Sequence, residues 1–416
     1  MLFKAVYRGL EVLHIRHYCR RIEFTFTVIF CSQGLCFSAL YIADQCHSDG
    51  TNIIRPSGSE EKSGRINLIK YRTLGKTGLK ISEIGMGTWQ LANDPNMWVG
   101  SDLDESLRAL YKFVELRGNF IDTAWIYGYD DKSPDRHPSE ELIGKYLKES
   151  GKRDQLIVAT KVPGKNMHWP ALKGVPVSEV FPNDWIEKCV DDSLRSLGTD
   201  VLDLVQFHVW QDDFANEDGW KETIQKIIKS GKVKYWGISI NDYQPTNCFK
   251  AIDTGLISTI QFIFNIFHQK PTEKLLPYAK EHNIGLIARV PLDEGGLSGN
   301  INADTKFAEG DFRRTYFSGD RLKELDSRVN QLNELLGPEA KTLPELALRY
   351  ILSWDEVSTV IPGTRKVKYA EENTAVSDGR KLSPKIMEEL KKHIWERNFY
   401  DDCHEPWLKD SGFIEP

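Results

Sequence analysis

Cysteine is scarce over most of this 416-residue chain, which limits the kinds of site that it can hold. Four of its seven cysteines lie in the first 50 residues, and only Cys189, Cys248 and Cys403 follow. Neither group has the close spacing of a metal-binding motif, so no metal site is expected. Sparse, unclustered cysteines are typical of a reducing compartment, which predicts a cytoplasmic protein without disulfides in this part of the chain.

The chain also lacks an excess of positive charge and the glycine turn that binds dinucleotides in doubly wound folds. Its 54 Lys and Arg residues against 60 Asp and Glu residues give a formal net charge of -6, so nucleic acid is not expected as a partner. Residues 85–90 are Gly-Met-Gly-Thr-Trp-Gln, without the third glycine and without a helix directly after them. A doubly wound fold is therefore disfavoured.

Residues 1–68 differ in composition from everything that follows. Basic residues precede an apolar, β-rich run at residues 22–43, and residues 48–65 are rich in glycine, serine and charge. Two interpretations stay open for this segment. It is either a signal-anchor within residues 1–45, because an apolar span of about 20 residues can cross a membrane, or an inert extension without stable structure. We favour the disordered extension, and expect membrane contact only if the anchor is real.

From residue 69 onward, short apolar runs alternate with amphipathic stretches of helical spacing. The runs predict strands at residues 84–89, 120–124, 156–161, 201–208, 235–240, 259–265, 285–291 and 357–363. Helices are predicted at residues 104–116, 140–148, 184–197, 220–229, 272–281, 321–336 and 342–353. This order predicts an α/β protein with a (β/α)8 TIM barrel over residues 69–416, and Gly75 and Gly78 predict an N-terminal hairpin that caps it.

Four polar side chains fall at or just beyond the ends of consecutive predicted strands. Asp122 closes the second strand with Tyr127 after it, Lys161 closes the third, and His208 closes the fourth. Neighbouring strands lie about 5 Å apart, so Lys161 is expected to reach both Asp122 and Tyr127. A cation beside a phenol favours the phenolate, and a histidine can bind the same incoming oxygen. The group predicts a site that protonates an oxygen as it gains negative charge.

Each of these residues also has a simpler interpretation when taken alone. The Asp-Lys pair is compatible with a structural ion pair, Tyr127 with a surface aromatic, and His208 with a core histidine. Their shared place at the strand ends favours the functional interpretation.

At these residues the sequence resembles the aldo-keto reductase family. The resemblance rests on residues 118–124 (Gly-Asn-Phe-Ile-Asp-Thr-Ala), 127–128, 139–144, 159–161, 193–198, 203–208, 231–233, 237–239, 361–363 and 372–373. It implies Asp122, Tyr127, Lys161 and His208 as a catalytic tetrad, with Tyr127 as the general acid. It also implies NADPH/NADP+ as the cofactor and a small-molecule carbonyl compound as the substrate.

The resemblance further implies which residues hold the cofactor. The residues expected to contact it are Thr88, Trp89, Asp122, Ser239, Asn241, Gln261, Arg289, Pro291, Leu292, Gly363, Thr364, Arg365, Glu372 and Asn373. Ser239 and Gln261 would hold the nicotinamide carboxamide, and Arg365 the 2′-phosphate, for which a guanidinium is well suited. The chain departs from the family pattern in three places: Ile240 separates Ser239 from Asn241, Arg289 replaces a stacking aromatic, and Tyr369 replaces a phosphate-binding arginine.

Two features bear on substrate access. Trp89, Trp125, Trp169 and Trp210 fall at or beyond the ends of the first four strands, which predicts an aromatic-walled pocket for an apolar or planar carbonyl compound. Residues 293–317 form a long loop, which the resemblance suggests is a flap over the cofactor and which is otherwise a solvated loop. The function expected is NADPH-dependent carbonyl reduction. The alternatives are a non-catalytic nucleotide-sensing subunit and a membrane-anchored scaffold.

Overall fold

The structure is a computed structural model; it describes residues 69–92, 94 and 97–395 in full, and residues 2–7, 10–19, 22–31 and 34–37 by their backbone. The chain divides into two compact units, Met1–Gly64 and Arg65–Pro416, which we describe separately.

The first unit contains one antiparallel sheet. Its strands are β1 (Leu2–Tyr7), β2 (Leu10–Cys19), β3 (Ile22–Cys31) and β4 (Gly34–Phe37), paired in the order β1-β2-β3-β4. The β-rich run at residues 22–43 supplies β3 and β4. Within the described part of the chain, no helix is both long enough and apolar enough to cross a membrane.

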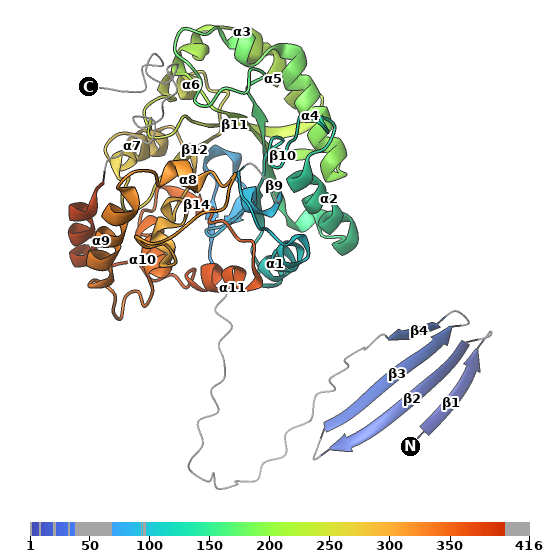
Figure 1. Ribbon diagram of the computed structural model, residues 1–416. Helices are drawn as coiled ribbons and strands as arrows, with labels where there is room; N and C mark the ends of the chain where they lie inside the picture. Colours follow the sequence, from blue (N-terminus) through green and yellow to red (C-terminus); the bar gives the residue numbers. More distant parts are fainter. Residues whose placement is uncertain are drawn as a thin grey trace. The chain divides into compact units, whose positions relative to one another are not determined.

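The second unit is a parallel barrel, as the sequence predicted. Its eight strands are β7 (Met86–Gly87), β8 (Phe120–Asp122), β9 (Ile157–Pro163), β10 (Leu202–His208), β11 (Val233–Ser239), β12 (Thr259–Ile263), β13 (Gly285–Arg289) and β14 (Val357–Val360). They pair in chain order, and parallel bridges from Ile84 to Val360 and from Gly87 to Gly363 close the sheet between its first and last strands. Figure 1 shows these strands at the centre of the unit, surrounded by helices.

The helices around the barrel follow the amphipathic stretches of the sequence. The predicted ones are α1 (Leu103–Glu115), α2 (Pro138–Ser150), α4 (Asn183–Leu197), α5 (Gly219–Lys229), α7 (Leu275–Glu281), α9 (Arg321–Asn333) and α10 (Leu343–Leu352). In α1, Asp102 accepts the first free N–H groups, and Ala109, Leu110 and Phe113 form the buried face. The sequence missed α3 (Val177–Val180), α6 (Phe249–Asp253), α8 (Arg313–Tyr316), α11 (Val367–Ala375) and α12 (Pro384–Leu390).

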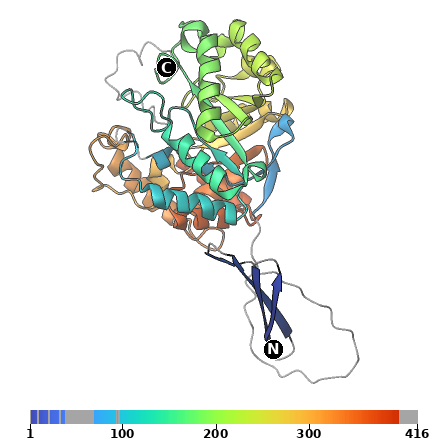
Figure 2. The same cartoon turned by 90° about the vertical axis from the view of Figure 1, so that its right-hand side faces the viewer.

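The predicted hairpin closes the amino-terminal end of the barrel. Strands β5 (Tyr71–Thr73) and β6 (Lys80–Ser82) pair antiparallel, and Leu74 and Ile81 pack with apolar side chains of the barrel interior. Gly75 has a positive φ of 48°, and a Cβ atom there would lie 2.1 Å from the backbone nitrogen of Gly285, so no larger residue fits. Figure 2 shows the hairpin, in light blue, on the opposite side of the barrel from the long loop after β13, in orange.

The register of the central strands places polar side chains in one layer of the interior. Side chains alternate along a strand, so Leu204, Gln206 and His208 of β10 share a face. Gln206 pairs with Lys161 of β9 and with Gly237 of β11, and His208 pairs with Ser239. Leu204 lies near the hairpin, and Gln206 and His208 lie near the carboxyl end of β10. The layer of polar side chains, and with it the candidate site, is therefore toward the carboxyl end of the barrel.

Candidate active site

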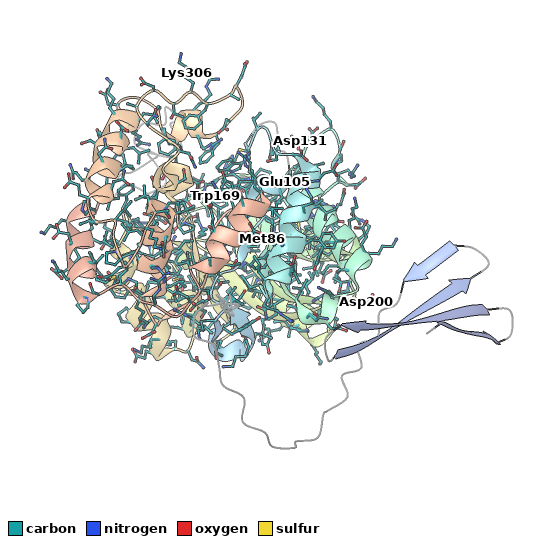
Figure 3. All side chains as sticks on the ribbon, turned by 90° about the horizontal axis from the view of Figure 1, so that it is seen from below. Met86, Glu105, Asp131, Trp169, Asp200 and Lys306 are labelled. Carbon is teal, nitrogen blue, oxygen red and sulfur yellow. The ribbon has the colours of Figure 1, made fainter. Side chains whose placement is uncertain are left out.

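A cavity of about 1540 Å³ lies at the carboxyl ends of the barrel strands. This volume exceeds the roughly 300–1,000 Å³ typical of a pocket for one small ligand, so there is room for two ligands. Figure 3 shows two lining residues, Asp131 and Lys306, at the same end of the barrel, and Asp200, which precedes β10, toward the other end. The cavity therefore occupies the end at which parallel barrels hold their sites.

A buried ion pair lies at the base of the cavity. The Lys161 ammonium is 2.5 Å from Oδ1 of Asp122, and the side chains are 0% and 2% exposed. Lys161 also donates to the Thr123 carbonyl at 2.7 Å. Two amides donate to the other carboxylate oxygen, Gln261 at 2.7 Å and Gln206 at 3.3 Å. The carboxylate is thus fully hydrogen-bonded, which a buried charge requires.

Tyr127 lies in the turn that follows β8. Its backbone N–H donates to the Ala124 carbonyl at 3.1 Å, and Gly128 continues the turn with a φ of 79°. The phenol oxygen accepts a hydrogen bond from Lys161 at 3.2 Å, and the ring stacks on Trp89 with centroids 6.1 Å apart. Asp122, Tyr127 and Lys161 are therefore brought together, with Tyr127 on the cavity side.

The pKa of Tyr127 is raised, in contrast to the effect expected from the sequence. Burial is the largest cause and outweighs the nearby charge of Lys161, which acts in the opposite direction. The lysine was expected to make the proton easier to give up, but the sequence could not weigh its charge against desolvation of the ring. The phenol is consequently protonated at neutral pH.

His208 completes the predicted group of four. Its ring centroid lies 5.8 Å from that of Tyr127, and it makes a T-shaped contact with the Trp169 ring, with centroids 4.7 Å apart. Burial lowers the His208 pKa well below its usual range, and the charges of Lys161 and Arg289 add to this effect. The imidazole is therefore neutral at physiological pH, and it can donate one N–H to a ligand.

Ser139 and Glu140, which the sequence indicated only as part of a family motif, form a buried polar network behind this group. The Ser139 hydroxyl lies 2.9 Å from both the Thr88 and the Thr123 hydroxyls. Glu140 accepts from the hydroxyl of Thr160 at 2.5 Å, and burial is the main reason that its pKa is raised to about 7. Gln206 was not among the predicted site residues, although a polar side chain within the apolar run of β10 was a signal for it.

Most of the predicted cofactor residues line the cavity. Thr88, Trp89, Asp122, Gln261 and Arg289 do so, as do Pro291 and Leu292 after β13 and Gly363, Arg365, Glu372 and Asn373 after β14. Ser239 and Thr364 are buried just behind the lining. Ser239 donates to Gln261 at 3.4 Å, and the Thr364 hydroxyl accepts from Asn373 at 3.2 Å.

Asn241 does not have the place expected of it. Its side chain is 1% exposed and lies outside the cavity lining. Its Oδ1 accepts from the backbone N–H groups of Ala171 and Trp210 at 3.0 and 3.4 Å, and its Nδ2 donates to the Ala171 carbonyl at 3.2 Å. The extra residue Ile240 shifts Asn241 beyond the strand, so its amide joins two loops instead of facing a ligand.

The predicted aromatic wall is also partly wrong. Trp89 and Trp169 line the cavity, whereas Trp125 and Trp210 are buried outside it. The Trp125 indole donates to Asp192 of α4 at 3.1 Å. Trp210 packs among aromatic side chains of the core and stacks on Phe207 at 5.5 Å. Position after a strand end placed all four residues near the mouth, but did not determine which way each side chain points.

The loop after β13 lines the cavity. It begins with the 3-10 turn Asp293–Ser298, and its Phe312 N–H donates to the Met97 carbonyl at 3.1 Å. The Phe312 ring lies 5.4 Å from Trp89, and the Arg313 guanidinium lies 4.3 Å from the Trp98 ring. Contact with the loop after β7 makes this segment part of the wall of the cavity.

Comparison with known proteins agrees with this geometry. The model of the Aldo/keto reductase family matches residues 83–394. Aldo-keto reductase YhdN of Bacillus subtilis (strain 168) is 32% identical over 302 residues, 72% of this chain and 86% of the relative. Aldo-keto reductase yakc of Schizosaccharomyces pombe, whose name includes NADP(+), is 27% identical over 305 residues, 71% of this chain and 84% of the relative.

A solved structure has the same fold. The glycerol dehydrogenase AKR11B4 from Gluconobacter oxydans superposes with a TM-score of 0.63 and 26% identity, over 79% of this chain and 97% of that one. The family match extends from the start of the barrel to the last described helix, and Asp122, Tyr127 and His208 of the predicted group line the cavity. The chain therefore belongs to the aldo/keto reductase family of oxidoreductases.

Proposed function

We propose that the protein uses NADPH to reduce an aldehyde or ketone to the alcohol, reversibly, with Tyr127 as the general acid. The observation that carries this proposal is the position of Lys161. Its ammonium bonds to Asp122 on one side and lies 3.2 Å from the phenol oxygen of Tyr127 on the other. A cation held at that place stabilises the phenolate that remains after the proton is given up.

The residues of the cavity fit a phosphorylated dinucleotide. The Gln261 amide offers a donor and an acceptor to a carboxamide. After β14, Arg365 offers a guanidinium to a phosphate. Gly87 and Gly363 also line the cavity, and a Cβ atom on Gly363 would lie 2.5 Å from the Gln90 side chain. The name of the relative yakc, with NADP(+), supports the same assignment. When bound, the cofactor supplies the hydride.

The four predicted catalytic residues then have distinct tasks. Burial keeps the Tyr127 phenol protonated at neutral pH, so the proton is available to the carbonyl oxygen. His208 is neutral and can orient the same oxygen by donating an N–H. Burial would lower the pKa of Lys161, but the charges of Asp122 and Tyr127 outweigh it and keep the ammonium protonated.

The substrate proposed is a small carbonyl compound with an apolar or planar body. Trp89 and Trp169 flank Tyr127 and His208, and Ile126 and Met97 add apolar surface to the cavity. Such a wall binds ring faces and aliphatic chains through burial of apolar area.

The proposal is tested by following NADPH oxidation with a panel of aldehydes and ketones, with wild type beside Tyr127→Phe. We expect the variant to lose about 10²- to 10⁴-fold in kcat, because the proton donor is gone, and to bind NADPH as wild type does in a fluorescence titration. Tyr129→Phe, two residues along the same loop, is the matched control and should keep most of the activity. Tight cofactor binding by wild type without turnover of any carbonyl compound would point instead to a nucleotide-sensing subunit.

A further inference from the structure

Arg289 and Asp242 form an ion pair in the wall of the cavity, close to the predicted catalytic group. Nη2 of Arg289 lies 2.6 Å from Oδ1 of Asp242, and the two side chains are 13% and 16% exposed. The same nitrogen donates to the carbonyl of Ile240 at 2.9 Å. Both side chains line the cavity. The guanidinium is therefore held against the end of β11 rather than extended into the cavity.

Asp242 also fixes the aromatic side of this wall. Its second oxygen, Oδ2, accepts the indole N–H of Trp169 at 3.3 Å. The Arg289 guanidinium lies 6.0 Å from the Trp169 ring, which makes the T-shaped contact with His208. One carboxylate thus joins segments that follow β9 and β11 with the end of β13.

The charge of Arg289 reaches the reaction centre. Burial raises the pKa of Tyr127 and lowers that of His208, and the charges of Lys161 and Arg289 act to lower both. Lys161 is compensated by Asp122, and Arg289 by Asp242. The two cations that act on Tyr127 are therefore each neutralised by a carboxylate of their own.

Glu294 is another carboxyl group on which the charge of Arg289 acts, and it differs from Asp242. Burial, followed by the charges of Asp293 and Asp242, raises the pKa of Glu294 to about 8. Its carboxyl group is mostly uncharged at neutral pH. Asp242 is thus the group that compensates Arg289.

We propose that Asp242 is a specificity-determining residue, which neutralises Arg289 so that the pocket beside Tyr127 takes uncharged carbonyl compounds and rejects acidic ones. This inference rests on the function proposed above. An acidic substrate must give up its hydration on entering, and it finds the nearest guanidinium already bound to Asp242, whose own charge repels it. A neutral aromatic carbonyl compound meets Trp89 and Trp169 without either penalty.

The substitution Asp242→Asn separates the two roles of this side chain. The amide oxygen of asparagine can still accept the Trp169 N–H, so the aromatic wall keeps its bond. The charge is lost, and Arg289 then presents a guanidinium that binds carboxylates through two parallel hydrogen bonds. The variant is expected to gain acidic substrates, which a merely structural role for Asp242 would not produce.

Benzaldehyde and 4-carboxybenzaldehyde test this directly, because they differ only in one carboxylate. Wild type should prefer benzaldehyde, and in Asp242→Asn the ratio of kcat/KM for the acidic over the neutral aldehyde should rise about tenfold or more, which corresponds to roughly 1.4 kcal/mol. The gain should appear as a lower KM for the acidic aldehyde. Fluorescence titration with the corresponding alcohols gives the same ratio from affinities, without turnover.

Two further variants decide whether Arg289 is responsible. The double variant Asp242→Asn/Arg289→Gln should return the ratio to near the wild-type value, and Asp131→Asn, which removes an exposed carboxylate from the same cavity, should change it less than about twofold. An unchanged ratio in Asp242→Asn, or a gain that persists in the double variant, would overturn the inference. Failure of wild type to turn over either aldehyde would contradict the proposed function, while the affinity ratio would still test Asp242.

Discussion

Gln261 donates its side-chain amide to Oδ2 of Asp122 at 2.7 Å, across the interior of the barrel from β12 to β8. The amide oxygen of Gln261 accepts from Ser239 at 3.4 Å. A residue expected to meet the nicotinamide carboxamide therefore also orients the carboxylate that holds Lys161. The amide has a second N–H and a second lone pair, so it can do both. Cofactor position and the geometry of the ion pair are thereby linked through one side chain.

Gln206 should support catalysis through Asp122 without touching the cofactor. Gln206→Met keeps the length of the side chain but removes the donor that lies 3.3 Å from Oδ2. We expect kcat/KM to fall by about 5- to 30-fold, equivalent to roughly 1–2 kcal/mol, because one hydrogen bond to a buried carboxylate is lost. NADPH affinity, measured by fluorescence, should stay near wild type. Gln155→Met, at an exposed position beside α2, is the control, and equal losses in both variants would contradict this role.

Arg365 should set the preference for NADPH over NADH. It lines the cavity and donates a long hydrogen bond, 3.5 Å, to the Gly100 carbonyl. In Arg365→Gln, the dissociation constant for NADPH should rise about 10- to 100-fold, since a guanidinium-phosphate bond contributes roughly 1.5–3 kcal/mol, while that for NADH should change little. Arg136→Gln, at an exposed ion pair before α2, provides the control. Equal weakening of both nucleotides would mean that Arg365 does not recognise the 2′-phosphate.

Trp169 and Trp125 should respond differently to the same substitution. Each tryptophan donates its indole N–H to an aspartate, and phenylalanine removes that bond while keeping an aromatic ring. Trp169→Phe, in the cavity wall, should change KM for aromatic aldehydes about three- to tenfold. Trp125→Phe should leave KM within about twofold and lower the free energy of unfolding by about 1–2 kcal/mol, measured by urea denaturation. An effect of Trp125→Phe on KM as large as that of Trp169→Phe would contradict the assignment of Trp169, and not Trp125, to the cavity wall.

The difference between these two tryptophans shows what the sequence could and could not predict. Alternating apolar runs determined the barrel, and charged residues at strand ends identified Asp122 and Lys161, because strands have few ways to place an ammonium group. The direction of a side chain beyond a strand end depends on the loop, so Trp125 and Asn241 were misplaced. Helix α11 was missed because its weakly amphipathic sequence, Val367–Ala375, follows a strand and lacks a side-chain cap. The Asp242–Arg289 pair was not predicted, because it depends on contacts between segments that are far apart in the sequence.

Glu140 should make the stability of the protein depend on pH. Its side chain is fully buried, accepts from Thr160 and Ser193 at 2.5 and 2.7 Å, and has a pKa raised to about 7, chiefly by burial. In the unfolded chain, Glu140 loses its proton near the ordinary glutamate pKa of 4.5, whereas in the folded chain it keeps the proton until about pH 7. The folded state therefore binds the extra proton, and this stabilisation is complete at low pH and is lost as the pH rises from about 4.5 to about 7.

Glu140→Gln removes the titration while its amide oxygen can still accept from Thr160 and Ser193. Urea denaturation of both proteins between pH 5 and 8 isolates the contribution of Glu140 in the difference between their free energies of unfolding. That difference should shift against wild type by up to about 3 kcal/mol as the pH rises, and then level off above about pH 7, where Glu140 is ionised in both states. Glu149→Gln, at the end of the same helix, should give a flat difference. A flat difference for Glu140→Gln as well would show that Glu140 is ionised throughout this range, with its charge compensated by the surrounding hydroxyl groups.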